Sequence, residues 1–281
     1  MSEQSIPMRG PISPEQVQSF SQQDLRDRFL VEDLLIPGAI RVVATHFDRS
    51  VAVGAVPINE PLTLTPVPEI RSEYFLEHRE IGIVNVGGPG HVEADGTDWR
   101  MEPEAVLYLG RGTRKVTFFS DDPDLPAAFY GFSAPAHTTY PNAVVTPEEG
   151  TIRELGDPLT SNRRTLRQCI HPDGVPSCQV VMGVTRLHPG SMWNTMPAHT
   201  HDRRTEFYLY FDVPADQRVV HLMGKPEETR HILTGDRDLV LSPSWSIHSG
   251  VGTSAYAFVW AMAGENQAFD DMDHVQITDI S

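Results

Sequence analysis

The chain has few cysteines. Only Cys169 and Cys178 occur among 281 residues, which excludes a fold held together by a disulfide framework. The two could pair with each other, but such sparse usage favours reduced thiols. This cysteine content is typical of a cytoplasmic protein.

Positive charge is also scarce. Lys and Arg number 22 against 38 Asp and Glu, which makes the formal net charge −16 at pH 7. No tract is rich in Lys or Arg, so the composition excludes a protein that grips a nucleic-acid backbone. The overall field repels anions, and an anionic substrate would therefore depend on a local group of arginines.

Long hydrophobic runs are missing as well. No apolar stretch reaches the roughly 18 residues expected of a membrane-spanning helix. Residues 1–7 show neither the basic start nor the apolar stretch of a secretory signal. We therefore expect a cytoplasmic protein with no membrane attachment.

Helical periodicity is confined to the start of the chain. Residues 13–20 and 21–30 are predicted to form helices, and Ser21 followed by Asp24 resembles a capping box. Beyond them, short apolar runs alternate with Gly- and Pro-rich turns. This pattern predicts a mainly β fold, a sandwich or a barrel. The clearest predicted strands are 40–47, 81–86, 105–109, 115–119, 178–188, 219–223, 239–241 and 256–260.

The chain is long enough for two modest domains. Residues 134–150 are rich in Pro and are predicted to be a linker. We therefore expect one domain over 1–145 and another over 146–281. The halves resemble a divergent internal repeat, because each contains a strand that runs into a tight turn.

One segment carries the chemistry. His199 and His201 stand at i and i+2, so they share a face of an extended strand. Glu206 follows five residues later at the start of an apolar run, and His248 lies in a turn-rich Pro/Trp/Gly segment. Three imidazoles and a carboxylate suit a divalent ion such as Zn²⁺, Mn²⁺, Fe²⁺ or Ni²⁺. The alternative is a set of ordinary core or surface histidines, which a lone His-x-His pair would favour.

The first half contains no His-x-His pair. Arg114 and Lys115 lie near the place that His248 takes in the second half. If the repeat is real, the N-terminal copy has kept the scaffold and lost the metal.

The motif His-x-His-x4-Glu with a distant His resembles the metal motif of the cupin superfamily. Several longer stretches are similar to the 5-keto-4-deoxyuronate isomerase family within it, and together they span nearly the whole chain. They are residues 26–32, 74–77, 134–141, 161–165, 193–201, 226–232, 242–252 and 264–274.

The resemblance implies a bicupin, that is two cupin-type antiparallel barrels with a few short helices. The N-terminal half would be a degenerate cupin without metal, and the C-terminal half would bind one zinc per subunit of a hexamer. The implied zinc ligands are His199, His201, Glu206 and His248. The implied activity converts 5-dehydro-4-deoxy-D-glucuronate to 3-deoxy-D-glycero-2,5-hexodiulosonate, a cytoplasmic step in the breakdown of pectin and related polyuronides.

Such an aldose–ketose isomerisation moves a proton from C2 to C1 through an enediolate. A divalent ion stabilises the developing negative charge, and one base must carry the proton. Glu206 is a candidate base, and Tyr208 shares its face and could donate to an oxygen. Barrel filling is the alternative for Tyr208. Glu265 and Asp271 are further candidates, with a solvated acidic tail as their alternative.

The substrate carboxylate calls for a guanidinium group. Surface solvation is the alternative for any single arginine, and we expect it for at least three of the candidates. The candidates are Arg163, Arg164, Arg203, Arg204 and Arg230.

Two other functions fit the same ligand set. One is a cupin oxygenase that uses Fe²⁺, and the other is a sugar-binding cupin without catalysis. Neither accounts for the long stretches that resemble the isomerase family.

Overall fold

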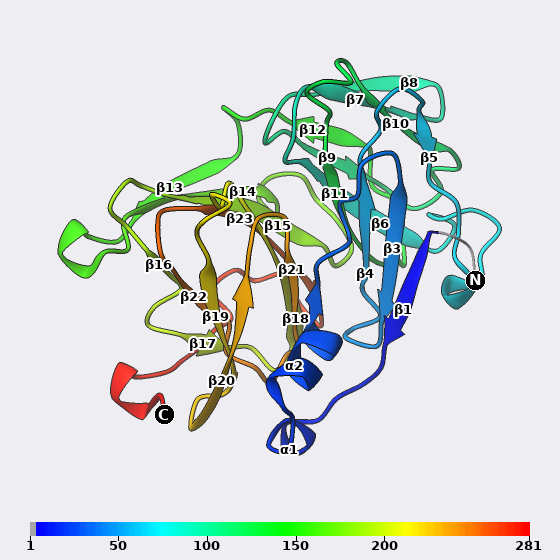
Figure 1. Cartoon of the computed structure of the whole chain (residues 1–281). Helices are drawn as coiled ribbons and strands as arrows, with labels where there is room; N and C mark the ends of the chain where they lie inside the picture. The colour runs from blue at the N-terminus through cyan, green and yellow to red at the C-terminus, as the bar shows by residue number, and fades with distance from the viewer. Residues whose placement is uncertain (1–3) are drawn as a thin grey trace. The chain divides into compact units, whose positions relative to one another are not determined.

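The computed structural model describes residues 4–281 and is mainly β, which confirms the predicted fold class (Figure 1). The chain forms two compact units. The first consists of residues 1–9, 33–151 and 168–182, and the second of residues 10–32, 152–167 and 183–281. Within the part of the chain that is described, no helix is both long and apolar enough to cross a membrane.

Each unit is built on a seven-stranded and a four-stranded sheet. In the first unit, the larger sheet has the order β1 (Ser5–Arg9), β3 (Ile40–Thr45), β4 (Val51–Ala55), β11 (Phe129–Pro135), β6 (Arg79–Asn85), β9 (Val106–Leu109) and β12 (Ala143–Val145). The smaller sheet has the order β5 (Leu62–Thr63), β10 (Val116–Ser120), β7 (Gly90–Ala94) and β8 (Thr97–Met101).

The second large sheet has the order β13 (Thr151–Leu155), β14 (Arg164–Ile170), β15 (Val181–Leu187), β23 (Ala257–Gly264), β18 (Arg204–Phe211), β21 (Leu239–Ser242) and β2 (Leu30–Val31). Its smaller companion has the order β16 (Trp193–Asn194), β22 (Ser249–Gly252), β19 (Val219–Lys225) and β20 (Glu228–Thr234). A separate ribbon joins β17 (His199–Thr200) to β24 (Asp273–His274).

The two pairs of sheets follow the same plan. Strand by strand, the central orders β3-β4-β11-β6-β9 and β14-β15-β23-β18-β21 match, and so do the two small sheets. This agreement supports the internal repeat. The division of the chain into halves 1–145 and 146–281 stays a prediction, while the compact units exchange segments across that boundary.

The internal repeat allows equivalent strand positions of the two units to be compared, including the position that Glu206 occupies in the second unit. Glu206 is the third residue of β18 and pairs with Ser242, the last residue of β21. Ile81 is the third residue of β6 and pairs with Leu109, the last residue of β9. An isoleucine thus takes the register position of the glutamate.

The core of the first unit explains why that position is apolar. Ile81 and Ile83 belong to a buried cluster that includes Val116 and Phe118 of β10 on the facing sheet. Alternate residues of a strand point to the same face, so one side of β6 fills the space between the sheets with hydrocarbon. The corresponding side of β18 carries polar groups instead.

Helices are short and peripheral. They are α1 (Pro14–Val17), α2 (Gln22–Phe29), and the 3₁₀ turns η1 (Pro68–Ile70), η2 (Pro158–Thr160) and η3 (Ile277–Asp279). The predicted capping box is confirmed: Ser21 Oγ accepts the amide of Asp24, and the Asp24 carboxylate accepts the amide of Ser21. Leu25 and Phe29, four residues apart, form the buried face of α2.

The segment predicted as a linker is in part a sheet strand. β11 continues to Pro135, and Ala143–Val145 pair with Val106–Tyr108 of β9 as β12. The prediction was wrong there because Pro can occupy the end of a strand and the flank of an edge strand without breaking a ladder.

The buried side chain of Glu80 accepts several hydrogen bonds within the first unit. Its side chain is fully buried, and its two carboxylate oxygens accept the amides of Cys178, Gln179 and Val180 and the hydroxyl of Tyr108 at 2.7–2.9 Å. The contact with the carboxylate raises the pKa of Tyr108, after the larger effect of burial. The carboxylate therefore satisfies two buried donors, from Tyr108 and Val180, and two partly buried ones, from Cys178 and Gln179.

We expect Glu80→Ala to destabilise the protein by at least about 3 kcal/mol, because it strands several buried and partly buried donors at once. Differential scanning calorimetry measures the loss as a drop in the melting temperature of the first unit. Glu102→Ala is the control, because its exposed ion pair with Arg100 contributes little. Equal melting temperatures for the two variants would contradict this role for Glu80.

Candidate metal centre and active site

Three elements of the second unit bring the predicted ligands together. His199 and His201 come from β17 and the turn after it, Glu206 from β18, and His248 from the residue before β22. The turn that positions His248 is closed by a hydrogen bond from the Ser246 amide to the Pro243 carbonyl. Strands of both sheets and the short ribbon therefore meet at one point.

The four ligand atoms converge. The Nε2 atoms of His199 and His248 lie 3.0 Å apart, and Glu206 Oε2 lies 3.0 Å from Nε2 of both His201 and His248. All four atoms lie within 4.8 Å of one another. Ligands about 2.0 Å from a tetrahedral zinc ion stand about 3.3 Å apart, which matches this spacing. The group can therefore hold a metal ion.

Hydrogen bonds behind the rings fix their orientation. His201 Nδ1 lies 2.9 Å from the Arg204 carbonyl oxygen, and His248 Nδ1 lies 3.3 Å from the Ser246 carbonyl oxygen. A carbonyl only accepts, so each Nδ1 carries a proton and donates it. Each Nε2 then offers its lone pair to the centre of the group, as a metal ligand requires.

The electrostatics of the group also suit a cation. Burial, followed by the proximity of His248, lowers the pKa of His199 to about 2. Burial alone would raise the pKa of Glu206, but the charge and hydrogen bonds of His248 and His201 hold it well below its usual value. Burial alone would lower the pKa of His201, but the hydrogen bond and charge of Glu206, with the hydrogen bond to the Arg204 carbonyl, together raise it. His201 and Glu206 thus share a proton that a bound metal ion would displace.

A cavity of about 480 Å³ opens beside the ligand group. The pocket has an apolar wall and a few polar groups, as small-molecule sites do. Its lining is Leu155, Arg164, Leu166, Thr185, Thr195, Met196, Pro197, His199, His201, Arg204, Glu206, Tyr208, Phe258, Trp260, Met262, Phe269, Met272, His274, Val275 and Gln276.

Arg204 supplies unsatisfied donors to this cavity. Its side chain is fully buried, and Nη2 donates to the Asp271 carbonyl at 2.9 Å. Nε and Nη1 are buried without any partner among the described residues. Such orphaned donors are costly in a folded protein unless a ligand satisfies them. They suit an anionic group, which accepts charge-assisted hydrogen bonds from a guanidinium.

Arg164 lines the same cavity and donates from Nη1 to the Asn162 carbonyl at 2.8 Å. Burial lowers the pKa of both Arg164 and Arg204. Two guanidinium groups thus line one cavity of a chain whose net charge is −16. They provide the local positive charge that an anionic substrate needs.

The other predicted arginines lie elsewhere. Arg163 is exposed and Arg230 donates to Glu228 and to the Gln18 carbonyl. Arg203 binds the carboxylates of Asp271 and Asp273 at 2.8–2.9 Å. None of the three is part of the cavity lining. Asp271, a candidate base, is thereby engaged outside the cavity, and its hydrogen bond with Arg203 lowers its pKa to about 2.

Tyr208 faces the cavity beside Glu206. Its hydroxyl lies 3.2 Å from Thr195 Oγ1, and burial raises its pKa well above the usual value. The phenol is therefore protonated at neutral pH and can donate a hydrogen bond. Further along β18, the Tyr210 hydroxyl lies 2.7 Å from His221 Nδ1, and neither residue is part of the cavity lining.

The C-terminal segment adds residues that the sequence reasoning missed. Phe269, Met272 and His274 line the cavity, because β24 pairs with β17 and places His274 opposite His199. The acidic run around them favoured a solvated tail. The only sequence signal for burial of this segment is that apolar residues interrupt its acidic run. A local pattern does not show which distant strand those residues contact.

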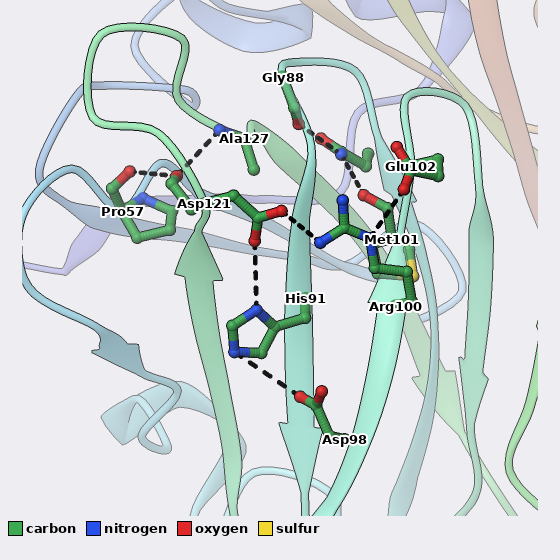
Figure 2. Close-up of polar contacts among 11 residues, drawn as sticks. Pro57, Gly88, His91, Asp98, Arg100, Met101, Glu102, Asp121 and Ala127 are labelled. Atoms are coloured by element: carbon green, nitrogen blue, oxygen red, sulfur yellow. Dashed lines mark hydrogen bonds and ion pairs between the residues drawn. The ribbon is translucent and has the colours of Figure 1, made fainter.

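A second group of titratable residues lies in the first unit and has a different character. Figure 2 shows His91 between Asp98 and Asp121, while Arg100 contacts Asp121 and Glu102. Both ring nitrogens of His91 face carboxylates, and Arg100 neutralises one of them. This group is an ion-pair network at the surface, and it lacks the convergent lone pairs of the His199 group.

The fold and the site together define a class. The two cupin-type pairs of sheets make this chain a bicupin. In the described residues of the second unit, a His₃Glu group that could hold a metal ion lies beside a cavity. The chain belongs to the KduI/IolB family, whose family model matches residues 38–277.

Its relatives are similar over nearly their full length. A protein of Kineococcus radiotolerans named 4-deoxy-L-threo-5-hexosulose-uronate ketol-isomerase is 61% identical over 271 residues, which cover 95% of this chain and 97% of that protein. A protein of the same name from Halalkalibacterium halodurans is 50% identical over 268 residues, covering 95% and 97%.

Solved structures support the fold. An IolB-like protein from Salmonella typhimurium superposes with a TM-score of 0.66 at 17% identity, covering 80% of this chain and 87% of that one. Oxalate decarboxylase from Bacillus subtilis superposes with a TM-score of 0.56 at 10% identity, covering 85% and 78%. At these identities the likeness concerns the fold alone.

Proposed function

We propose that this chain is a ketol-isomerase that acts on 4-deoxy-L-threo-5-hexosulose uronate, the compound in the names of its relatives, in the breakdown of pectin and related polyuronides. The observation that carries the proposal is one cavity in which a His₃Glu group lies beside a buried arginine with two orphaned donors. A uronate that is isomerised needs recognition of its carboxylate at one end and charge stabilisation at the other. The identity of 61% to a relative of that name supports the substrate.

The proposed metal is Zn²⁺, held by His199, His201, Glu206 and His248. Neutral imidazoles and one carboxylate are ligands that zinc accepts. When bound, the divalent ion supplies Lewis-acid stabilisation of negative charge on the reacting oxygens. His201, Glu206 and His248 are buried, which lowers the local dielectric and strengthens this effect.

The arginines orient the substrate. Arg204 Nη1 donates to an oxygen of the substrate carboxylate, and Arg164 adds positive charge beside it. The carbon chain of the sugar then lies along the apolar wall formed by Leu166, Phe258 and Trp260. This placement brings C1 and C2 to the histidine end of the cavity, in the geometry that proton transfer requires.

Glu206 is the proposed base. Its Oε2 faces the imidazoles of His201 and His248, and the residue lines the cavity. A carboxylate with a depressed pKa is ionised and can take the proton from C2 and return it to C1. Tyr208, protonated and oriented by Thr195, donates to the oxygen where charge develops.

Removing the metal tests the proposal. Incubation with dipicolinate followed by desalting is expected to abolish turnover of the deoxy-ketouronate, and stoichiometric Zn²⁺ is expected to restore it. The assay follows the C2 proton into solvent or product and is run with and without oxygen. A fully active protein without metal would contradict the proposal. Activity that stops without oxygen would identify an oxygenase, and tight binding without turnover would identify a sugar-binding cupin.

Three finer predictions accompany this function. They are the loading of zinc rather than another divalent ion, a hexameric assembly, and a cytoplasmic location. Metal analysis of the purified protein and light scattering check the first two.

A further inference from the structure

The first unit contains a cavity of its own, about 340 Å³ in volume. This volume suits a small organic molecule. The cavity combines basic and hydroxyl groups with a small apolar surface, and one glutamate stands among them. Its lining is Met8, Ala44, Thr45, His46, Arg49, Val51, Glu69, Ile70, Ser72, His78, Arg79 and Pro135.

Arg79 is the cationic group of this cavity. It is only 8% exposed. Its Nε donates to Ser133 Oγ, and its Nη2 donates to the Arg49 and Ser133 carbonyls at 2.7–2.8 Å. All of these acceptors are neutral, and the carboxylate of the adjacent Glu80 accepts hydrogen bonds from other donors. A buried guanidinium is therefore held in place without a hydrogen-bonded anion.

Free donors face the same cavity. Nη1 of Arg79 has no hydrogen bond among residues 4–281, and the Ser72 hydroxyl is buried with no partner there. The Arg49 side chain is exposed at the cavity and makes no ion pair within the described part of the chain. Two unsatisfied donors and a free guanidinium around one space favour an anionic occupant.

Arg79 occupies the position in the first unit that is equivalent to Arg204 in the second. Arg79 is the first residue of β6 and Arg204 is the first residue of β18, and both strands hold the same place in the sheet order. Arg79 is in phase with Ile81 and Arg204 with Glu206, so both arginines point between the sheets of their own unit. The first unit has hydrocarbon where the second has metal-type ligands, yet both units keep a buried arginine at this position.

We propose that this cavity of the first unit binds a small hydroxylated carboxylate of sugar-acid size. Arg79 Nη1 and the Ser72 hydroxyl donate to the carboxylate, and Arg49 closes over it. Glu69 accepts from the ligand hydroxyls, and Met8 and Ile70 contact its carbon chain. The glutamate repels a phosphate or sulfate dianion more than a carboxylate, because the repulsion grows with the ligand charge.

The test uses the intact metal-loaded protein and D-galacturonate as the probe. Crystals soaked with it are expected to show its carboxylate against Arg79 and Ser72. Calorimetric titration is expected to show a binding event that weakens about tenfold or more in the Arg49→Ala, Ser72→Ala double variant. Turnover of the deoxy-ketouronate is expected to stay unchanged, which separates this site from the catalytic cavity whatever the outcome there.

Arg71→Ala is the matched control. Arg71 is an exposed arginine next to Ser72 that does not line the cavity. If Arg71→Ala weakened binding as much as the double variant, the effect would be general electrostatics and the site would be disproved. Density for the probe with no change in titration would mean binding at crystal concentration only. An empty cavity in soaked crystals would equally overturn the proposal.

Discussion

Replacing His248 with alanine is expected to remove the bound metal and to lower kcat/KM by at least about a thousandfold, roughly 4 kcal/mol of transition-state stabilisation. His248 Nε2 lies 3.0 Å from both His199 Nε2 and Glu206 Oε2. Its loss removes one of the four ligand atoms and opens one side of the ligand group. Metal content of the purified variant and its turnover of the deoxy-ketouronate measure the two effects.

His231→Ala is the control for this variant. His231 lies on β20 and is exposed, and it takes no part in the cavity lining. It should keep wild-type metal and turnover. A His248→Ala protein that lost its metal yet kept its rate would rule out a role of the metal in catalysis. One that kept stoichiometric metal would show that His248 is not a required ligand.

Replacing Arg204 with methionine is expected to raise KM for the deoxy-ketouronate about a hundredfold, the equivalent of roughly 2.7 kcal/mol. The substituted side chain has similar length and is apolar, so it fills the buried space without leaving a charge. The hydrogen bond from Nη1 to the substrate carboxylate is lost. Steady-state kinetics measure the change. Inhibition by D-galacturonate should weaken in parallel, whereas the response to neutral D-galactose should not change.

Two further variants interpret that result. Arg163→Ala removes an exposed arginine of the same region and should leave KM unchanged. Arg204→Lys keeps the charge but loses the planar fork, and should fall between wild type and Arg204→Met. A melting temperature close to wild type shows that the fold is intact. An unchanged KM in a folded Arg204→Met protein would assign the carboxylate to another group.

The two halves of the molecule illustrate how one scaffold supports different interiors. Ile81 and Glu206 hold the same register position, and so do Arg79 and Arg204. Lys115 directly precedes β10 as His248 directly precedes β22. Sheet order depends on backbone pairing and on the alternation of buried residues, so it tolerates an exchange of a metal ligand for hydrocarbon.

The sequence by itself determined the mainly β class, the Ser21 capping box and the four residues of the candidate metal group. These features are local or carry a distinctive spacing: strand alternation, a cap three residues from its partner, and His-x-His-x4-Glu. The distant His248 was proposed from its turn-rich Pro/Trp/Gly setting, and the resemblance to a known family implied the same ligand. Strand alternation also placed Tyr208 beside Glu206.

Only the tertiary structure decided which arginines reach the cavity, that Pro135 and Ala143–Val145 belong to the sheet, and that the C-terminal segment joins β17. Arg203 and Arg204 are neighbours in sequence, but Arg203 lies in the turn before β18 and Arg204 is the first residue of that strand, so their side chains leave the backbone in different directions. Arg203 therefore binds the carboxylates of Asp271 and Asp273 outside the cavity lining, whereas Arg204 is buried with two unpartnered donors. The outcome depends on contacts between residues about 70 positions apart, which no local pattern encodes.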